Sequence, residues 1–582
     1  MENLHPTPQF KRDKWYSLDG KWDFAFDDKK AGDKEKWYEH FPKGTQIQVP
    51  FTYETKASGI HQTDHHETVW YERTLHINDL NKHPILHFEG VDYEAFVYIN
   101  GKLAGKHQGG YHAFSVDIFP FVHIGENRLT VKVNDSKDCS QPRGKQRWRE
   151  ENFGCWYVQT TGIWKTVWLE YVSPIYLNHA KITPLFDDQE VLIELETKNI
   201  PIDQNGYKVK AIVLFDGKQM NALSATVIDG VATLQGSVLE RNDPWTMRAW
   251  TPEDPALYDL QFTLYKDNEV IDEVSSYFGM RKISIEGSKI LLNNRELYQR
   301  LILDQGYWPE SDLTPPNVNA LEVDIQSIKD LGYNGVRKHQ KVEDSRFLYL
   351  ADKKGLLVWL EVGSTYTFND QAVKKFTQEW MEIVKQSYNH PSVITWVPFN
   401  ESWGIHDIHV NNRQQDFTKS IYFMTKTYDP MRPVITNDGW EHTISDIITL
   451  HDYEEFGAIF TKRYQDKELL LSNSMQFNKD FYPFAGSHSY KGQPVIISEF
   501  GGIAFRTEEG WGYGNQVKDD ESFFKRFEEI HHAIQDLDYI VGYCYTQLTD
   551  VQQEVNGLLT MDRQPKVSVE KVREINMRRM KP

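Results

Sequence analysis

Two acidic residues each follow a short apolar run of the kind that forms a buried strand. Glu401 comes after WVPFN in the segment WVPFNESWG, and Glu499 comes after PVIIS in PVIISEF. A carboxylate at the edge of an apolar core costs free energy unless water or a partner compensates for it. A single glutamate at a strand end is most often simply solvated. The pair, rather than either residue alone, therefore indicates chemistry.

Two carboxylates on either side of a scissile bond are the basic equipment for glycoside hydrolysis. One must be protonated to assist the leaving group, and the other must be ionised to attack or to activate water. Asn400 could bond a sugar hydroxyl, and the rings of Trp403 and Trp308 could form walls for a sugar. The sequence therefore predicts a carbohydrate site centred on Glu401 and Glu499.

The segment that carries both glutamates alternates between helical and strand-like patterns. In NALEVDIQSIKDLG, Leu321, Ile325 and Ile328 recur at helical spacing, and Gly332 is placed to end the helix. With LYQRLILD as the first, eight such strands alternate with helices over about 300 residues. This pattern predicts a (β/α)8 barrel. A doubly wound open sheet is the alternative, but no G-x-G-x-x-G follows a predicted strand.

In a barrel of this kind the active site lies at the carboxyl ends of the strands. Strands four and seven face each other across the barrel, so we expect Glu401 and Glu499 to meet across a bound sugar. All eight predicted strand ends carry polar residues: Asp304; Arg337 and His339; Glu361; Asn400 and Glu401; Asn437 and Asp438; His451, Asp452 and Tyr453; Glu499; Gln547 and Asp550.

Some of these residues also fit a purely structural role. Glu361 could form a salt bridge within the packing near the rim. Asn437 and Asp438 precede Gly439, a combination that is typical of a simple turn. Both interpretations of these three residues remain open at this stage.

The remainder of the chain has the pattern of two β-domains. Residues 1–173 contain short alternating runs and are predicted to form a β-sandwich, in which Asn100-Gly101 suits a type I′ hairpin turn. Residues 174–283 contain about seven shorter strands and are predicted to form an immunoglobulin-like sandwich. The barrel then occupies residues 284–582. The basic and aromatic segment QPRGKQRW is either a loop that reaches the barrel mouth or a solvated turn.

Composition excludes several classes of partner. The net charge of −19, with no basic stretch to offset it, argues against nucleic acid. The sequence contains no run of 18 apolar residues, so no membrane span is predicted. No apolar leader segment is visible at the start of the chain, and a cytoplasmic protein is therefore expected. The three cysteines lack disulfide or metal spacing, although Cys139 and Cys155 could pair. We expect no cofactor and no essential metal ion, and a homo-oligomer remains open.

Several segments resemble one enzyme family along nearly the whole chain. LDGKWDF, GGYHAFSVDI and TTGIWKTVWLE are similar to the N-terminal, jelly-roll-like sugar-binding sandwich of glycoside hydrolase family 2. VPFNESWG resembles the acid/base segment of that family, and VIISEFGG resembles its nucleophile segment. The resemblance implies a retaining enzyme with Glu401 as acid/base, Asn400 as its amide partner and Glu499 as nucleophile. It also implies a carboxyl separation of about 5–5.5 Å.

The resemblance is weaker where the family reads its sugar. Arg337 can be carried over, His339 aligns only loosely, and the Asn-x-Lys-Gly motif that holds a uronate in β-glucuronidases is missing. LDQGYWP and YTQLTDVQQEVNGLL resemble a β-galactosidase-like branch. We therefore expect an exo-acting enzyme that removes a terminal, β-galactoside-like sugar. The alternatives are a galactofuranosidase, an arabinosidase, a β-mannosidase, a β-glucuronidase or a non-catalytic carbohydrate-binding protein.

Overall fold

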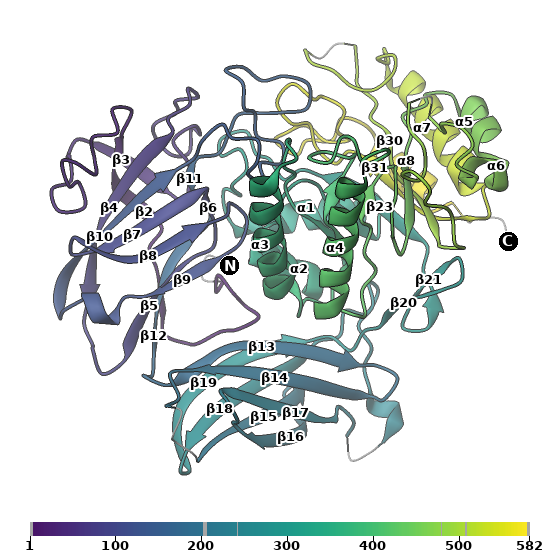
Figure 1. Cartoon of the computed structure of the whole chain (residues 1–582). Coiled ribbons are helices and arrows are strands. Elements are labelled where there is room, and N and C mark those ends of the chain that lie inside the picture. The colour runs from purple at the N-terminus through teal and green to yellow at the C-terminus, as the bar shows by residue number, and fades with distance from the viewer. Residues whose placement is uncertain (1–3, 202–205, 241–242, 479, 507–508, 579–582) are drawn as a thin grey trace.

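The computed structural model describes residues 4–201, 206–240, 243–478, 480–506 and 509–578. The chain forms two β-sandwiches followed by a TIM barrel (Figure 1). In this view the first sandwich lies on the left, the second below, and the helices of the barrel in the centre and on the right. The outer ends of the predicted first sandwich (1–3) and of the predicted barrel (579–582) lie outside the described residues.

The first sandwich has two main antiparallel sheets around an apolar core. The turn between β7 (Glu94–Ile99) and β8 (Lys102–Gln108) has positive φ at Asn100 (51°) and Gly101 (80°), which is the conformation that a type I′ turn requires. The smaller sheet is β1 (Trp15–Ser17), β12 (Val167–Val172), β5 (His83–Phe88) and β9 (Phe114–Asp117). The larger is β3 (Thr45–Val49), β2 (Gly20–Phe26), β4 (Thr68–Ile77), β10 (Gly125–Asn134), β7 (Glu94–Ile99) and β8 (Lys102–Gln108). A separate pair is β6 (Val91–Asp92) and β11 (Gly162–Ile163).

The second sandwich has the seven antiparallel strands expected of an immunoglobulin-like domain. One sheet is β13 (Tyr176–Leu185), β14 (Glu190–Lys198) and β17 (Val231–Ser237). The other is β16 (Lys218–Thr226), β15 (Tyr207–Phe215), β18 (Tyr258–Lys266) and β19 (Glu269–Phe278). A small sheet then leads into the barrel: β20 (Ile283–Glu286), β21 (Lys289–Leu292) and β22 (Arg295–Glu296). Its Ile283 and Ile290 share an apolar core with barrel-strand residues such as Leu301.

The barrel strands follow the predicted order, with one change in the middle. Seven form a continuous parallel sheet: β26 (Val393–Val397), β25 (Leu357–Glu361), β24 (Gly335–Lys338), β23 (Gln299–Asp304), β31 (Ile540–Thr546), β30 (Val495–Gly501) and β29 (Ile448–His451). The predicted fourth strand is interrupted at Pro398, which has no N–H for a ladder bond. It resumes as β27 (Phe399–Asn400) and pairs with β28 (Asn437–Asp438). The rest of the predicted fifth strand is reduced to a bridge between Val434 and Trp396.

The helices cover the barrel and leave the strand ends accessible to loops. Helix α1 begins after Asn317, whose side chain accepts a hydrogen bond from Ala320 N, and it ends before Gly332 (φ 87°), as predicted. The helices are α1 (Val318–Asp330), α2 (Ser345–Lys354), α3 (Asp370–Ser387), α4 (Asn412–Tyr428), α5 (Gly457–Tyr464), α6 (Lys467–Leu471), α7 (Asp520–Gln535) and α8 (Val569–Asn576). Within the described ranges, no helix has the length and apolar character needed to cross a membrane.

The cysteines form no disulfide. All three are free, so the pairing of Cys139 with Cys155 that the sequence left open is wrong. The Sγ atom of Cys139 lies 3.8 Å from the carbonyl oxygen of Lys137, whereas the Cys155 thiol lies beside Lys145. The two thiols are thus held by different parts of the same long loop.

Candidate active site

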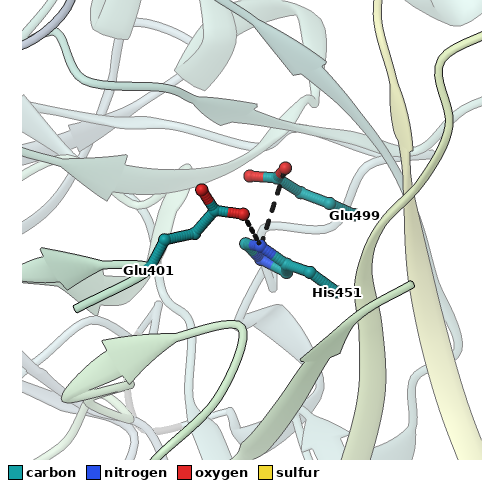
Figure 2. Close-up of side chains that lie close together, drawn as sticks. All are labelled: Glu401, His451 and Glu499. Carbon is teal, nitrogen blue, oxygen red and sulfur yellow. Dashed lines mark hydrogen bonds and ion pairs between the residues drawn. The ribbon is translucent and has the colours of Figure 1, made fainter. Parts of the chain in front are cut away.

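Glu401 and Glu499 converge at the carboxyl end of the barrel, where both approach the same ring nitrogen of His451 (Figure 2). His451 Nδ1 lies 2.8 Å from Glu401 Oε1 and 3.6 Å from Glu499 Oε2. One oxygen of each carboxyl group and the histidine nitrogen all lie within 4.8 Å of one another. The three residues come from β30, from the end of β29 and from the turn after β27. The barrel topology therefore brings both acids to one place, at a short separation.

The backbone at Glu401 is held in an unusual conformation. Glu401 and Ser402 have φ values of 51° and 57°, in the left-handed region that residues other than glycine rarely adopt. Glu401 N donates to Asp438 O (2.9 Å), and Ser402 N donates to the side chain of Asn437 (3.0 Å). β28 is therefore more than a simple turn, because it fixes the sharp bend that directs Glu401 into the site.

Glu499 is surrounded by donors and positive charge. Arg337 Nη1 donates to its Oε1 (2.7 Å), and the Tyr453 hydroxyl donates to its Oε2 (2.5 Å). Burial alone would raise the pKa of Glu499, but the charges of His451 and Arg337 lower it below its ordinary value. Glu499 is therefore an ionised carboxylate at neutral pH.

Glu401 is shifted in the opposite direction. Burial, together with the negative charge of Glu499, raises the pKa of Glu401 above its ordinary value, despite the contact with His451. For His451, burial would lower the pKa, but Glu499 and Asp438 raise it to about 10. The histidine is thus an imidazolium at neutral pH. The site holds one carboxyl group that favours the protonated form beside one that favours the ionised form.

Arg337 is the centre of the ion-pair network beneath the two glutamates. Its guanidinium is fully buried and lies 2.8 Å from both Glu361 and Asp438. It also donates to Asn400 Oδ1 at 2.6 Å. This contact turns the amide so that Asn400 Nδ2 is a buried donor with no partner among the described residues. Because an unused buried donor costs about 1–3 kcal/mol, Nδ2 is suited to a ligand oxygen.

Other predicted rim residues are used within the fold. Asp304 forms an ion pair with Lys338 (2.5 Å), and Asp550 forms one with Lys566 (3.0 Å). Gln547 accepts from Gln305 and donates to Asn556, both at 2.7 Å. His339 lies 3.1 Å from Glu361, and Asp452 binds Arg463 and Tyr464. The rim is thus less uniform than its sequence suggests.

The two tryptophans expected as sugar walls lie in different surroundings. The Trp403 ring lies near the rings of His339 (6.2 Å) and Trp156 (5.6 Å), next to the carboxyl pair along the chain. Trp308 instead lies between two cations, with Lys341 4.8 Å and Arg563 4.6 Å from its ring centroid. It lines a separate surface hollow, so the structure does not bring it to the glutamates.

A loop of the first sandwich, residues 135–161 between β10 and β11, enters the barrel mouth. Arg143 N and Gly144 N both donate to Ser364 O, at 2.8 and 3.2 Å. Gly144 has φ 60°, and a Cβ there would lie 2.4 Å from Gln340 O, so the close approach requires glycine. QPRGKQRW therefore reaches the barrel, and its interpretation as a solvated turn is wrong. The loop brings Lys145 to 4.9 Å from the Trp403 ring centroid, a residue that sequence reasoning missed.

A second missed residue supports the ring of Tyr453. Tyr513, from the segment between β30 and α7, stacks on it with ring centroids 3.4 Å apart and planes 5° apart. The only feature of the sequence that could have indicated a role for Tyr513 is its position in an aromatic, glycine-rich segment, EEGWGYGN. Tyr513 therefore fixes the donor that holds Glu499.

Glu401, His451 and Glu499 are also the one group, among the described residues, whose ligand atoms lie close enough to hold a metal ion. A metal needs a deprotonated imidazole, however, and His451 is an imidazolium with both nitrogens directed at carboxyl groups. The chemistry of this group therefore fits proton transfer better than metal binding.

A TIM barrel with two carboxyl groups at its strand ends, one of raised and one of lowered pKa, is typical of glycoside hydrolases. Family models agree along the whole chain. The glycosyl hydrolases family 2 sugar binding domain matches residues 15–174, the glycosyl hydrolases family 2 model matches 175–281, and the family 2 TIM barrel domain matches 283–580. The chain belongs to glycosyl hydrolase family 2.

Relatives within the family carry two activities in their names. A putative β-glucuronidase of Formosa agariphila is 28% identical over 62% of this chain, and a β-galactosidase of Thermoanaerobacter pseudethanolicus is 25% identical over 60%. The chain spans only 42% and 47% of their respective lengths. A β-glucuronidase of Paenibacillus borealis is 24% identical, with 96% of both chains covered.

Solved structures show the same fold. The crystal structure of Ruminococcus gnavus β-glucuronidase superposes with a TM-score of 0.79 at 20% identity. The alignment covers 100% of this chain and 99% of that one. The three-domain arrangement in Figure 1 is therefore also the fold of that solved structure.

Proposed function

We propose that the protein is a retaining, exo-acting glycoside hydrolase in which Glu499 is the nucleophile and Glu401 is the acid/base. The observation that carries this proposal is the opposite shift of two carboxyl pKa values within one site, around one imidazolium. An inverting enzyme needs carboxyl groups about 6.5–9.5 Å apart to admit a water molecule between them. Oxygens within 4.8 Å of each other support the retaining alternative.

In the first step, Glu499 attacks the anomeric carbon and forms a glycosyl ester as the glycosidic C–O bond breaks. Glu401 transfers its proton to the departing oxygen. Arg337 and Tyr453 hold the Glu499 oxygens in place for the attack. Asn400 Nδ2 is placed to donate to a sugar hydroxyl, such as the 2-OH, where a bond can strengthen at the transition state.

In the second step, water attacks the anomeric carbon and Glu499 leaves as a carboxylate. Glu401, now ionised, takes the proton from that water, so both residues return to their starting states. His451 lies close to both carboxyl groups, so its positive charge stabilises the ionised form of either glutamate as the cycle proceeds. The loop 135–161 covers one side of the barrel mouth and favours action on a terminal sugar.

The sugar itself is a finer proposal. The sequence favoured a β-galactoside-like substrate, whereas the relatives named above favour a β-glucuronide over a β-galactoside. We place a terminal β-glucuronide first and a β-galactoside second. The missing Asn-x-Lys-Gly motif means that a uronate would have to be recognised by other residues.

The test is a panel of 4-nitrophenyl glycosides with the wild-type protein and Glu499→Ala. Wild-type turnover of at least one β-glycoside is expected, and the variant should lose about 10⁴-fold or more in kcat while keeping its melting temperature. NMR of the first-formed sugar should show the β-anomer. Tight sugar binding without turnover of any member would instead favour a carbohydrate-binding protein, and an α-anomer product would contradict retention.

A further inference from the structure

The charges at the barrel mouth indicate what kind of sugar it accepts, given the proposed function. The loop 135–161 contains five cationic residues, Lys137, Arg143, Lys145, Arg147 and Arg149, and the rim contributes several more. Lys145 differs from most of them in its surroundings.

Most cations near the carboxyl pair are neutralised by acids of the chain. Arg337 is paired with Glu361, Asp438 and Glu499. The other pairs are Lys338 with Asp304 and Glu343, Lys341 with Glu343, and Arg143 with Asp135. These contacts leave no excess positive charge on those side chains. Arg147, in turn, donates to the side chains of Gln159 and Asn152 and to the carbonyl of Thr63, away from the glutamates.

Within the described part of the chain Lys145 also lacks a carboxylate partner, but unlike Arg147 it lies over the ring of Trp403. It is buried, with 6% of its surface exposed, and among the described residues no carboxylate oxygen lies within 4.0 Å of its Nζ. Its ammonium lies 4.9 Å from the centroid of Trp403, two residues after Glu401. A buried ammonium without an ion-pair partner is costly, so a site that keeps one is suited to an anionic ligand.

The charge of Lys145 is maintained by the site. Burial alone would lower its pKa, but the nearby acidic groups Cys155, Glu554, Glu499 and Glu401 raise it above its ordinary value. The two catalytic candidates therefore lie within electrostatic range of the ammonium, which contacts Trp403 two residues after Glu401.

We propose that Lys145 selects a sugar acid, with its ammonium binding the carboxylate of a terminal uronate. The indole of Trp403 would hold the ammonium on one side while the ligand carboxylate approaches from another. The cation comes from a loop of the first sandwich, whereas the glutamates belong to the barrel. Recognition of the acid thus depends on contact between two domains.

The test compares substrates that differ only at the carboxylate. For 4-nitrophenyl β-D-glucuronide against the β-D-glucoside, and β-D-galacturonide against the β-D-galactoside, wild-type kcat/KM should favour the acid. Lys145→Gln should reduce that acid-to-neutral ratio by about 10- to 100-fold, the usual effect of removing a charged contact. Lys145→Arg should restore part of it.

The matched control is Lys137→Gln in the same loop, because Lys137 is more exposed and pairs with Glu150 (2.6 Å). Its ratio should equal that of the wild type. Two results would overturn the inference: turnover of neutral glycosides only, or an acid-to-neutral ratio of kcat/KM that is unchanged in Lys145→Gln. Either result would leave the proposed function intact. Absence of turnover for every glycoside would reject the proposed function instead.

A second measurement does not depend on a folded variant. Free D-glucuronate should inhibit or bind the wild-type protein at least about tenfold more tightly than D-glucose. The preference should weaken at high salt, because the contact is ionic. Equal affinity for the two sugars would contradict a role for Lys145 in reading the carboxylate.

Discussion

Two acid-rich parts of the barrel rim differ in the number of cations that form ion pairs with their carboxyl groups. Around Arg337 and His451, four acids share two cations: Glu361, Glu401, Asp438 and Glu499. Around Asp304, two acids share two lysines, because Lys338 and Lys341 both contact Glu343. We call these the crowded group and the balanced group.

The pKa shifts follow this ratio. In the balanced group burial would raise both values, but the lysines lower the pKa of Asp304 and bring that of Glu343 to about 2. In the crowded group the pKa is lowered for Asp438 and Glu499 but raised for Glu401 and Glu361, where burial is the largest cause. With fewer cations than acids, one carboxyl group has a raised pKa beside another whose pKa is lowered. That is what acid catalysis requires.

The largest effect should come from removing the acid of the crowded group. Glu401→Ala should lower kcat/KM by about 10²–10⁴-fold for glycosides with poor leaving groups, since their oxygen needs a proton. Dinitrophenyl glycosides should be nearly unaffected in the first step and should show a burst followed by slow release. The measurement is pre-steady-state kinetics with both substrate types. Equal losses for both would show that Glu401 is not the acid.

A smaller effect should come from changing the number of cations. His451→Gln removes a positive charge that lowers the pKa of both Glu499 and Glu401, so both values should rise. Activity needs Glu499 ionised, above its pKa, and Glu401 protonated, below its pKa. The whole profile of kcat/KM against pH should therefore shift toward higher pH by about one pH unit or more.

The control for His451 is His531→Gln, a buried histidine of α7 whose ring nitrogen bonds a backbone carbonyl. Its profile should keep the wild-type position. A His451→Gln profile that loses height without moving along the pH axis would show that the histidine acts by shape alone. The crowded group would then need another explanation for its opposite pKa shifts.

The barrel and the meeting of Glu401 with Glu499 were predictable, because strand-end residues are local in sequence and the barrel topology brings those ends together. The partners of each acid were not. VRKH does not reveal that Arg337 reaches Glu499 while the adjacent Lys338 reaches Asp304. Nor does QPRGKQRW reveal that Arg143 pairs with Asp135 while Lys145 lies over the ring of Trp403. Such choices depend on packing between distant segments.

The smallest effect on activity should come from the balanced group. Asp304→Asn leaves Lys338 buried with only Glu343 as its partner, which should destabilise the protein by about 3 kcal/mol, near the lower end for a broken buried pair. Because the pKa of Asp304 is lowered on folding, its contribution is present at neutral pH and is lost as pH falls below about 4. The melting temperature of the variant should thus fall most at neutral pH and converge with the wild type in acid, while kcat/KM stays close to the wild type.

Glu310→Gln is the control, because its exposed pair with Lys56 contributes about 0–1 kcal/mol. Asp304→Asn could instead lose as much activity as Glu401→Ala while its stability is unchanged. The crowded and balanced groups would then not differ in function, and the ratio of acids to cations would not identify the reactive group.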